Sequence, residues 1–396
     1  VLYIYQGKYE KAELLCLNAL ELKKHVLGEN HLQYTVSLNN LAMLYKSQGK
    51  YTQAELLYIQ ALEIRKNLQD TNNCAIASYL SNLALLYNSQ GRYKKAEDTC
   101  IEALELYRQI LGENHPHFTQ CLNNLALIYE FQGRYNEAEL LYIKNLELRK
   151  QIVGENHPNI ATSLNNLALT YKCQGRYEEA EKLLIEALEL IKELLGENHP
   201  HYAYSLENLA LVYKYQKRYE KAETLYMKAM ELCKQLLGEH HPSVSTNLNN
   251  LAELYRSQGN YNTAEPLCQK ALELTKQLLG KNHPEFATSL SNLGIIYYSQ
   301  GRYDEAEPLY IEALELRKSL LGENHPHYAT SLNNLAYLYN SQGKYEQAES
   351  LYIQALRLYQ RVLGENHQNT VEAKKNLAYF WCEGIKNGYF SIKVLQ

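Results

Sequence analysis

Residues 37–66 read SLNNLAMLYKSQGKYTQAELLYIQALEIRK, and this stretch decides the fold. Its first half places Leu38, Leu41 and Tyr45 at positions i, i+3 and i+7, which form one face of an α-helix. The turn Gln48-Gly49 follows, and its glycine permits the backbone that ends a helix. The second half carries another helical stripe, made of Ala54, Leu57, Tyr58, Ala61, Leu62 and Arg65. The stretch therefore predicts two antiparallel helices, which we call helix A and helix B of one unit.

The unit recurs every 42 residues without insertion or deletion. The turn that joins helix A to helix B marks each copy: Gln6-Gly7, Gln48-Gly49, Gln90-Gly91, Gln132-Gly133, Gln174-Gly175, Gln216-Lys217, Gln258-Gly259, Gln300-Gly301 and Gln342-Gly343. A glycine ends helix B in most units, and a proline often begins the next helix A. Because two short helices cannot bury both of their apolar faces alone, the units should stack into one α-solenoid.

The predicted organisation is a single solenoid of about nine units over residues 1–383, cut at both ends, with a divergent tail at 384–396. We count nine B helices and nine A helices, and residues 1–5 are the stump of an earlier helix A. A solenoid normally closes with a polar cap. The short apolar tail either folds back as a makeshift cap or is an artefact of the gene prediction, and the sequence leaves both open. Apolar surface at unfinished ends would also permit self-association.

The composition excludes several classes of protein. The chain has 396 residues with 40 basic and 44 acidic side chains, and this balance argues against a nucleic-acid binder. No apolar run approaches the length of a membrane span, and no signal-peptide pattern opens the sequence. The 8 cysteines form no CxxC pair, so we expect free thiols and a cytoplasmic protein. Three of them share a position that holds tyrosine in most other units and should be core residues: Cys16, Cys100 and Cys268.

Recurrent polar residues are interpreted as structural. A histidine precedes each helix A except one, and we expect it to make a capping or an inter-repeat hydrogen bond rather than bind a metal. These histidines are His31, His115, His157, His199, His241, His283, His325 and His367. The tyrosines that open each helix B, such as Tyr51, and those of helix A, such as Tyr45, should pack between helices. The glutamate after the helix B alanine, such as Glu55, should pair with a nearby basic residue. The sequence holds no catalytic motif, so we predict no enzyme, no catalytic residue, no metal site and no cofactor.

The unit resembles the tetratricopeptide repeat, with the spacing Leu38-x2-Leu41-Ala42-x2-Tyr45, then Gly49, Ala54-x3-Tyr58 and Ala61. Its length of 42 residues and its Leu-Asn-Asn-Leu-Ala, Gln-Gly-Arg-Tyr and Gly-Glu-Asn-His-Pro segments are similar to the repeats of kinesin light chains. The resemblance implies an all-α, right-handed superhelix of antiparallel helix pairs. Kinesin light chains bind their motor heavy chain through a heptad region. No heptads precede Val1, so we expect heavy-chain binding to need a region outside this sequence.

The resemblance also implies a peptide-binding groove on the concave face formed by the A helices. Related repeats use the second Asn of Leu-Asn-Asn-Leu-Ala to clamp a peptide main chain, and an amide supplies the donors and the acceptor for this. The predicted clamp residues are Asn124, Asn166, Asn208, Asn250 and Asn292. The alternative is that each Asn bonds to a neighbouring helix or loop.

Specificity should come from positions that differ between units. Lys172, Lys214 and Arg256 occupy one position of helix A in three consecutive units, and Tyr215 and Tyr298 lie close to this stripe in the pattern. A basic stripe beside aromatic walls would suit an acidic peptide with a large apolar anchor, as the resemblance to kinesin light chains also implies. The alternative is a solvated helix face whose positive field Glu207 and Glu253 weaken.

The sequence therefore predicts a non-catalytic scaffold that binds peptide segments of other proteins in its concave groove. The resemblance favours a kinesin light chain-like cargo adaptor in microtubule-based transport, in the cytoplasm and associated with the cytoskeleton. The alternative is a sensor or regulatory array of a larger signalling protein, with an NTPase or effector domain outside this chain. We expect no nucleic acid and no membrane insertion.

Overall fold

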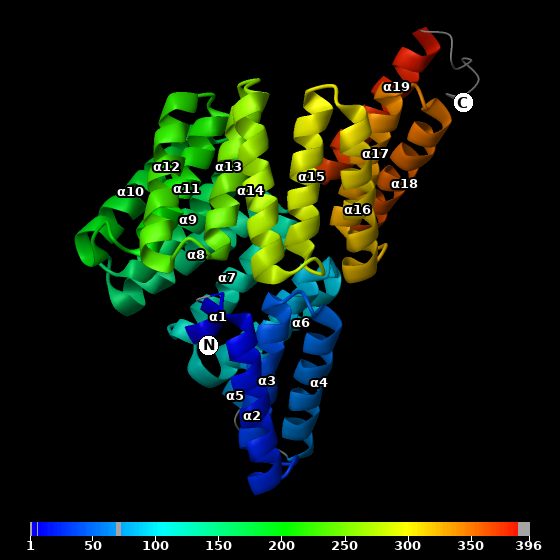
Figure 1. Ribbon diagram of the computed structural model, residues 1–396. Coiled ribbons are helices and arrows are strands. Elements are labelled where there is room, and N and C mark those ends of the chain that lie inside the picture. The colour runs from blue at the N-terminus through cyan, green and yellow to red at the C-terminus, as the bar shows by residue number, and fades with distance from the viewer. Residues whose placement is uncertain (1, 6, 69–72, 387–396) are drawn as a thin grey trace.

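Figure 1 shows the computed structural model, which describes residues 2–5, 7–68 and 73–386. These residues form 19 helices and no strand. Helix α1 (Leu2–Tyr5) is the predicted stump. The B helices are α2 (Tyr9–Leu27), α4 (Tyr51–Asn67), α6 (Tyr93–Leu111), α8 (Tyr135–Val153), α10 (Tyr177–Leu195), α12 (Tyr219–Leu237), α14 (Tyr261–Leu279), α16 (Tyr303–Leu321) and α18 (Tyr345–Leu363). The A helices are α3 (Leu32–Ser47), α5 (Asn73–Ser89), α7 (Pro116–Phe131), α9 (Pro158–Cys173), α11 (Pro200–Tyr215), α13 (Pro242–Ser257), α15 (Pro284–Ser299), α17 (Pro326–Ser341) and α19 (Gln368–Lys386).

The arrangement confirms the predicted all-α solenoid. Each helix packs against the next one along the chain, and consecutive A helices also contact one another, as α5 does with α7 and α13 does with α15. The A helices therefore form the inner layer of the array. None of the described helices combines the length and the apolar character that a bilayer span requires.

Local sequence sets where each helix begins and ends. The Nδ1 atom of His157 accepts the backbone N–H of Asn159 at 3.1 Å, and Pro158 takes the first helical position, where its missing N–H does no harm. The same capping bond occurs at His31, His115, His199, His241, His283, His325 and His367, so the predicted capping role is confirmed. Helix α8 ends at Gly154, whose φ of 81° favours glycine.

The core repeats from unit to unit. In α4, Ala54 and Tyr58 are fully buried, and the equivalent tyrosines of later B helices are buried as well: Tyr142, Tyr226, Tyr310 and Tyr352. Cys100 and Cys268 replace this tyrosine as buried free thiols, as predicted, whereas Cys16 is only half-buried. The tyrosines predicted to pack between helices are all buried or half-buried. Full burial of a large apolar side chain stabilises a fold by roughly 1.5–3 kcal/mol.

A repeated polar network joins successive B helices at their first turns. Arg176 donates to the two carboxylate oxygens of Glu139 at 2.8 and 2.9 Å, and Gln174 donates to the same carboxylate at 2.8 Å. The guanidinium of Arg176 also lies 3.8 Å from the centre of the Tyr171 ring. The same ion pair recurs as Lys50–Glu13, Arg92–Glu55, Arg134–Glu97, Arg218–Glu181, Arg302–Glu265 and Lys344–Glu307. The prediction that this glutamate has a basic structural partner is confirmed in these units. In two others the donor is aromatic, because Tyr255 donates to Glu223 and Trp381 donates to Glu349.

The array winds back so that units far apart in the sequence touch. The Nε2 atom of His283 lies 3.3 Å from the carbonyl oxygen of Ser47, and His325 has the same relation to Ser89. Figure 1 shows the N-terminal helices (blue) beside the ends of α14 and α15 (yellow). We call the units of residues 7–133 the first turn, those from residue 242 onward the second turn, and these approaches the inter-turn contacts.

The C-terminal helix α19 follows the repeat pattern and extends it. Its Leu377 and Phe380 are buried, and the indole N–H of Trp381 donates to Glu349 at 2.7 Å. Residues 384–386 of the predicted tail continue this helix. The rest of that tail lies outside the described residues.

Candidate functional site

The predicted basic stripe lies on the inner layer, on α9, α11 and α13. Lys172, Lys214 and Arg256 each sit near the C-terminal end of their helix, and all three are half-buried. We refer to these residues together with Tyr215 as the groove cluster. The repeat register predicted their adjacency, because equivalent positions of stacked helices line up.

Tyr215 is the aromatic centre of the groove cluster. Its side chain is 48% exposed, and its ring stacks on Tyr177 with ring centres 5.8 Å apart. The ammonium groups of Lys172 and Lys214 lie 5.7 and 5.4 Å from the centre of the Tyr215 ring. Both distances are within the range of a cation–π interaction. The structure thus presents an exposed aromatic ring within cation–π distance of two ammonium groups.

Glu253 neutralises the other end of the stripe. Its carboxylate accepts two hydrogen bonds from Arg256, at 2.6 and 2.8 Å, and lies 3.7 Å from the Lys214 ammonium. Burial raises the pKa of Glu253, but the bonds from Arg256 outweigh burial and hold this pKa below its ordinary value. Burial lowers the pKa of Lys214, and Glu253 partly offsets that effect. Among the described residues, Lys172 is therefore the one cation of the stripe that forms no ion pair with Glu253.

Two further carboxylates lie in the same face. Glu130 accepts hydrogen bonds from Thr170 at 2.7 Å and from the hydroxyl of Tyr142 at 3.0 Å, and burial raises its pKa. Glu207 accepts from Asn247 at 2.8 Å, and burial raises its pKa to about 7. The groove therefore carries acidic as well as basic side chains, as the presence of Glu207 and Glu253 in the sequence indicated.

Amides of the predicted clamp bond to the residue before the equivalent asparagine of the preceding unit. Asn166 donates to Asn123 at 2.8 Å, and Asn208 donates to Asn165 at 3.0 Å. Two more bonds of this kind are Asn82 to Asn39 and Asn124 to Ser81. Each of these asparagines donates one side-chain N–H group to the neighbouring helix. Its second N–H group can donate to a ligand. Asn250 and Asn292 are half-buried at the equivalent positions. The clamp role stays a prediction.

Tyr298 does not join the groove cluster. Its hydroxyl lies 3.0 Å from the hydroxyl of Ser341, and its ring is tilted against Tyr303 with centres 5.7 Å apart. It is half-buried on α15. The structure thus places this predicted site residue one unit beyond Arg256, in contact with the next units.

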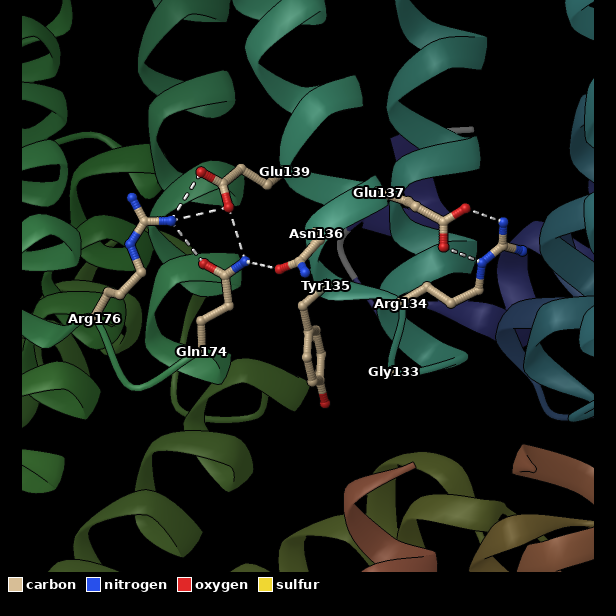
Figure 2. Close-up of a pocket in the computed structure, with 8 residues that line it drawn as sticks. All are labelled: Gly133, Arg134, Tyr135, Asn136, Glu137, Glu139, Gln174 and Arg176. Atoms are coloured by element: carbon tan, nitrogen blue, oxygen red, sulfur yellow. Dashed lines mark hydrogen bonds and ion pairs between the residues drawn. The ribbon is translucent and has the colours of Figure 1, made fainter. Parts of the chain in front are cut away.

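One polar cavity of the array is formed by the residues of the repeated ion-pair network. Figure 2 shows this cavity of about 500 Å³ between α8 and α10, with Glu139, Gln174 and Arg176 bonded to one another. On its other side Arg134 donates to Glu137 at 2.6 Å. Because these charged groups satisfy one another, this cavity offers a ligand no unpaired charge. Across the described part of the chain, no three His, Cys, Asp or Glu side chains gather as a metal site would require.

Three polar residues at the inter-turn contacts were not predicted. Lys46, Glu285 and His327 line one cavity although they come from opposite turns. One sequence signal is that Glu285 is acidic at a position where no other unit has an acidic residue. The equivalents are Gln33, Ala75, His117, Asn159, His201, Ser243, His327 and Asn369.

A family model described as tetratricopeptide repeat matches residues 1–67, 75–151, 118–184, 159–235, 205–265, 243–319, 285–359 and 328–379. The chain belongs to the tetratricopeptide repeat family. Tetratricopeptide repeats form scaffolds suited to protein–protein interaction, and the fold is in general non-catalytic. A search of curated proteins finds no match.

Several solved structures are similar to this tetratricopeptide repeat chain. BtubC (BKLC) from P. vanneervenii is 24% identical, with 59% of this chain and 92% of that chain covered and a TM-score of 0.47. A putative kinesin light chain with nearly identical TPR-like repeats, from Podosopora anserina, is 25% identical over 52% of this chain and 97% of that chain, with a TM-score of 0.43. A Rap protein complexed with Competence and Sporulation Factor is 17% identical over 89% of this chain and 99% of that chain, with a TM-score of 0.53. The likeness to the Rap protein shows the fold alone.

Proposed function

We propose that this tetratricopeptide repeat chain is a non-catalytic scaffold that binds peptide segments of other proteins across the groove cluster. The observation that carries the proposal is Tyr215, a half-exposed ring with the ammonium groups of Lys172 and Lys214 within cation–π distance. An aromatic or other large apolar side chain can stack on such a ring, and flanking carboxylates can pair with the two cations. The ligand class is therefore an acidic peptide with one large apolar anchor.

The test is a fluorescence anisotropy titration of the full chain with a labelled peptide of Asp and Glu residues around one Trp. The double variant Lys172→Glu and Lys214→Glu should weaken binding about tenfold or more, since each lost charge-assisted contact is replaced by repulsion. The matched control is Lys182→Glu with Lys270→Glu. It changes the net charge equally at exposed positions of the B helices α10 and α14. Equal weakening by the two double variants would mean that only net charge matters, and the proposed site would be wrong.

The predicted Asn clamp contributes through the peptide backbone in this proposal. Replacing Asn166, Asn208 and Asn250 with alanine should weaken the binding of peptides of any sequence to a similar degree. Each hydrogen bond contributes about 0.5–1.5 kcal/mol. A change in the ranking of different peptides would instead assign these amides to side-chain recognition.

At the level of cell biology, we propose a cargo-adaptor role like that of kinesin light chains, in the cytoplasm on microtubules. The support is the 42-residue unit, whose segments resemble kinesin light-chain repeats. The test is co-purification of the kinesin heavy chain with the full-length protein from its own cells. Co-purification of a signalling NTPase without heavy chain would support the sensor array instead.

A further inference from the structure

The first and second turns enclose a cavity of about 410 Å³ that the groove cluster does not share. We call it the inter-turn chamber. Lys46, Asn88 and Tyr93 line it from the first turn, and Glu285, His325 and His327 line it from the second. Its volume lies within the range of about 300–1,000 Å³ that is typical of small-molecule sites.

Lys46 brings an unpaired positive charge to the chamber. Within the described residues, no carboxylate lies at ion-pair distance from its ammonium group, although it occupies the same repeat position as Lys172. Burial lowers the pKa of Lys46 to about 8. A desolvated ammonium is costly unless an anion pairs with it. The first turn therefore holds a cation that an anionic group would stabilise.

Glu285 brings an unpaired negative charge from the opposite turn. No ion pair joins it to Lys46 or to any other basic side chain of the described residues. Burial raises the pKa of Glu285, and the more distant charge of Arg317 opposes this effect. Arg317 itself is held by Ser331 at 2.7 Å. The two walls of the chamber thus carry opposite charges that do not neutralise each other.

The rest of the lining is suited to an apolar body. The rings of Tyr93 and Phe131 stack with centres 6.2 Å apart, and Leu85 and Leu127 lie beside them in the lining. Asn88 is 7% exposed, and its Oδ1 atom has no hydrogen-bond partner in the described part of the chain. A buried acceptor without a donor is expensive to leave unsatisfied. The chamber therefore offers a ligand one cation, one anion and an apolar wall.

We propose that the inter-turn chamber binds a small zwitterion with an apolar side chain, of the size of an apolar amino acid or dipeptide. The ligand carboxylate pairs with Lys46, its ammonium group pairs with Glu285, and its side chain lies against Tyr93. Because its two ends bind opposite turns, such a ligand also holds the turns together. The site is independent of the groove cluster, so peptide binding there can fail without affecting this proposal.

The experiment is isothermal titration calorimetry of the full chain with three probes. These are L-phenylalanine, the dipeptide L-leucyl-L-phenylalanine, and N-acetyl-phenylalanine amide, which keeps the side chain but lacks both charges. We expect saturable binding of the free amino acid or of the dipeptide, and the better of the two identifies the length that the chamber accepts. Absence of binding by both zwitterions, or equal binding of the capped amide, would overturn the proposal.

Variants on the two turns locate the binding. Lys46→Met and Glu285→Gln should each weaken the affinity for the zwitterion about tenfold or more, as expected for the loss of one charge-assisted contact. Lys182→Met, on the exposed side of α10, is the matched control and should bind as the wild type does. Circular dichroism checks that each variant is folded, and the two variants are independent because they lie on different turns. Unchanged affinity in a folded variant of either residue would contradict the assigned pose.

Discussion

The Nε2 atom of His283 lies 3.3 Å from the carbonyl oxygen of Ser47, a residue 236 positions earlier in the chain. The Nδ1 atom of the same ring accepts the backbone N–H of Glu285 at 3.1 Å. Since Nδ1 accepts, Nε2 must carry the proton that bonds to Ser47, and the ring is neutral. His325 repeats both bonds with Ser89 and His327. A helix cap of one turn therefore serves at the same time as a contact to the other turn.

Adding one methyl group at the inter-turn contacts should push the turns apart. A Cβ on Gly49 would stand 2.6 Å from Pro284, and one on Gly91 would stand 2.8 Å from Pro326. We predict that the double variant Gly49→Ala and Gly91→Ala has a larger radius of gyration than the wild type, as measured by small-angle X-ray scattering.

The chain supplies a matched control for this prediction. Gly175 and Gly259 have the same positive φ, near 79° and 76°, but a Cβ there would meet nothing within 4 Å. Alanine at these two positions carries the same backbone strain without the clash. If both double variants expand equally, or neither does, the turns are not held by this contact.

Acid should also separate the turns. Burial lowers the pKa of His325 to about 4, because its effect, together with the charge of Arg317, outweighs the bond to Ser89. Burial likewise lowers the pKa of His283. A histidine whose folded pKa is depressed stabilises the contact fully above its unfolded value of about 6.5. That contribution is lost as the pH falls through the folded pKa. The charged or titratable neighbours are Arg317, His327 and Glu285.

We therefore expect the radius of gyration to rise as the pH falls from about 6.5 to about 4. In a His283→Asn and His325→Asn variant, asparagine can still cap each helix but cannot reach the opposite turn. This variant should be expanded already at neutral pH and change less on acidification. The equivalent changes at His157 and His199 cap helices without inter-turn contacts, so they should leave the wild-type acid response intact.

The fold could be predicted because its determinants are local and repeated. The cap at His157, the helix end at Gly154 and the pair Arg176–Glu139 each depend on residues within one unit or its neighbour. The alignment of Lys172, Lys214 and Tyr215 followed from the same register. A period of 42 residues was therefore enough to place them.

The inter-turn contacts could not be predicted in this way. His283 and His157 occupy the same position of the repeat, yet only His283 lies against Ser47. The difference arises from small rotations between units that add up over several repeats, and those rotations depend on packing rather than on a motif. The chamber residues Lys46 and Glu285 were missed for this reason.

Glu207 should make the stability of the array depend on pH near neutrality. Burial raises its folded pKa to about 7, so its stabilising contribution is complete below the unfolded value and is lost as the pH rises through the folded one. Glu207→Gln keeps an acceptor for Asn247 but cannot ionise. We predict a higher melting temperature than the wild type at about pH 8 and no difference at about pH 4.

Glu253 provides a comparison, because its pKa is shifted in the opposite direction to that of Glu207. Arg256 holds its pKa below the ordinary value, so its contribution is present above the unfolded pKa and is lost as the pH falls. Glu253→Gln should therefore lower the melting temperature at about pH 8. If Glu207→Gln lowers it as well, the Glu207 carboxylate is paired in solution by a cation, and its raised pKa would be wrong.

Lys217 is a site of stored backbone strain that one substitution can release. It occupies the turn that is glycine in the other units, with a φ of 59°, and is the only residue other than glycine with positive φ among the described residues. A left-handed backbone costs a side chain about 1–2 kcal/mol, whereas glycine avoids this cost but loses more entropy on folding. Lys217→Gly should therefore stabilise the chain by about 0.5–1 kcal/mol, seen as a higher midpoint of urea unfolding.

The reverse change, Gly175→Lys, tests the same backbone with open space around the Cβ. It should lower the midpoint by a similar amount, and a midpoint that falls in both variants would mean that Lys217 makes a stabilising contact through its side chain.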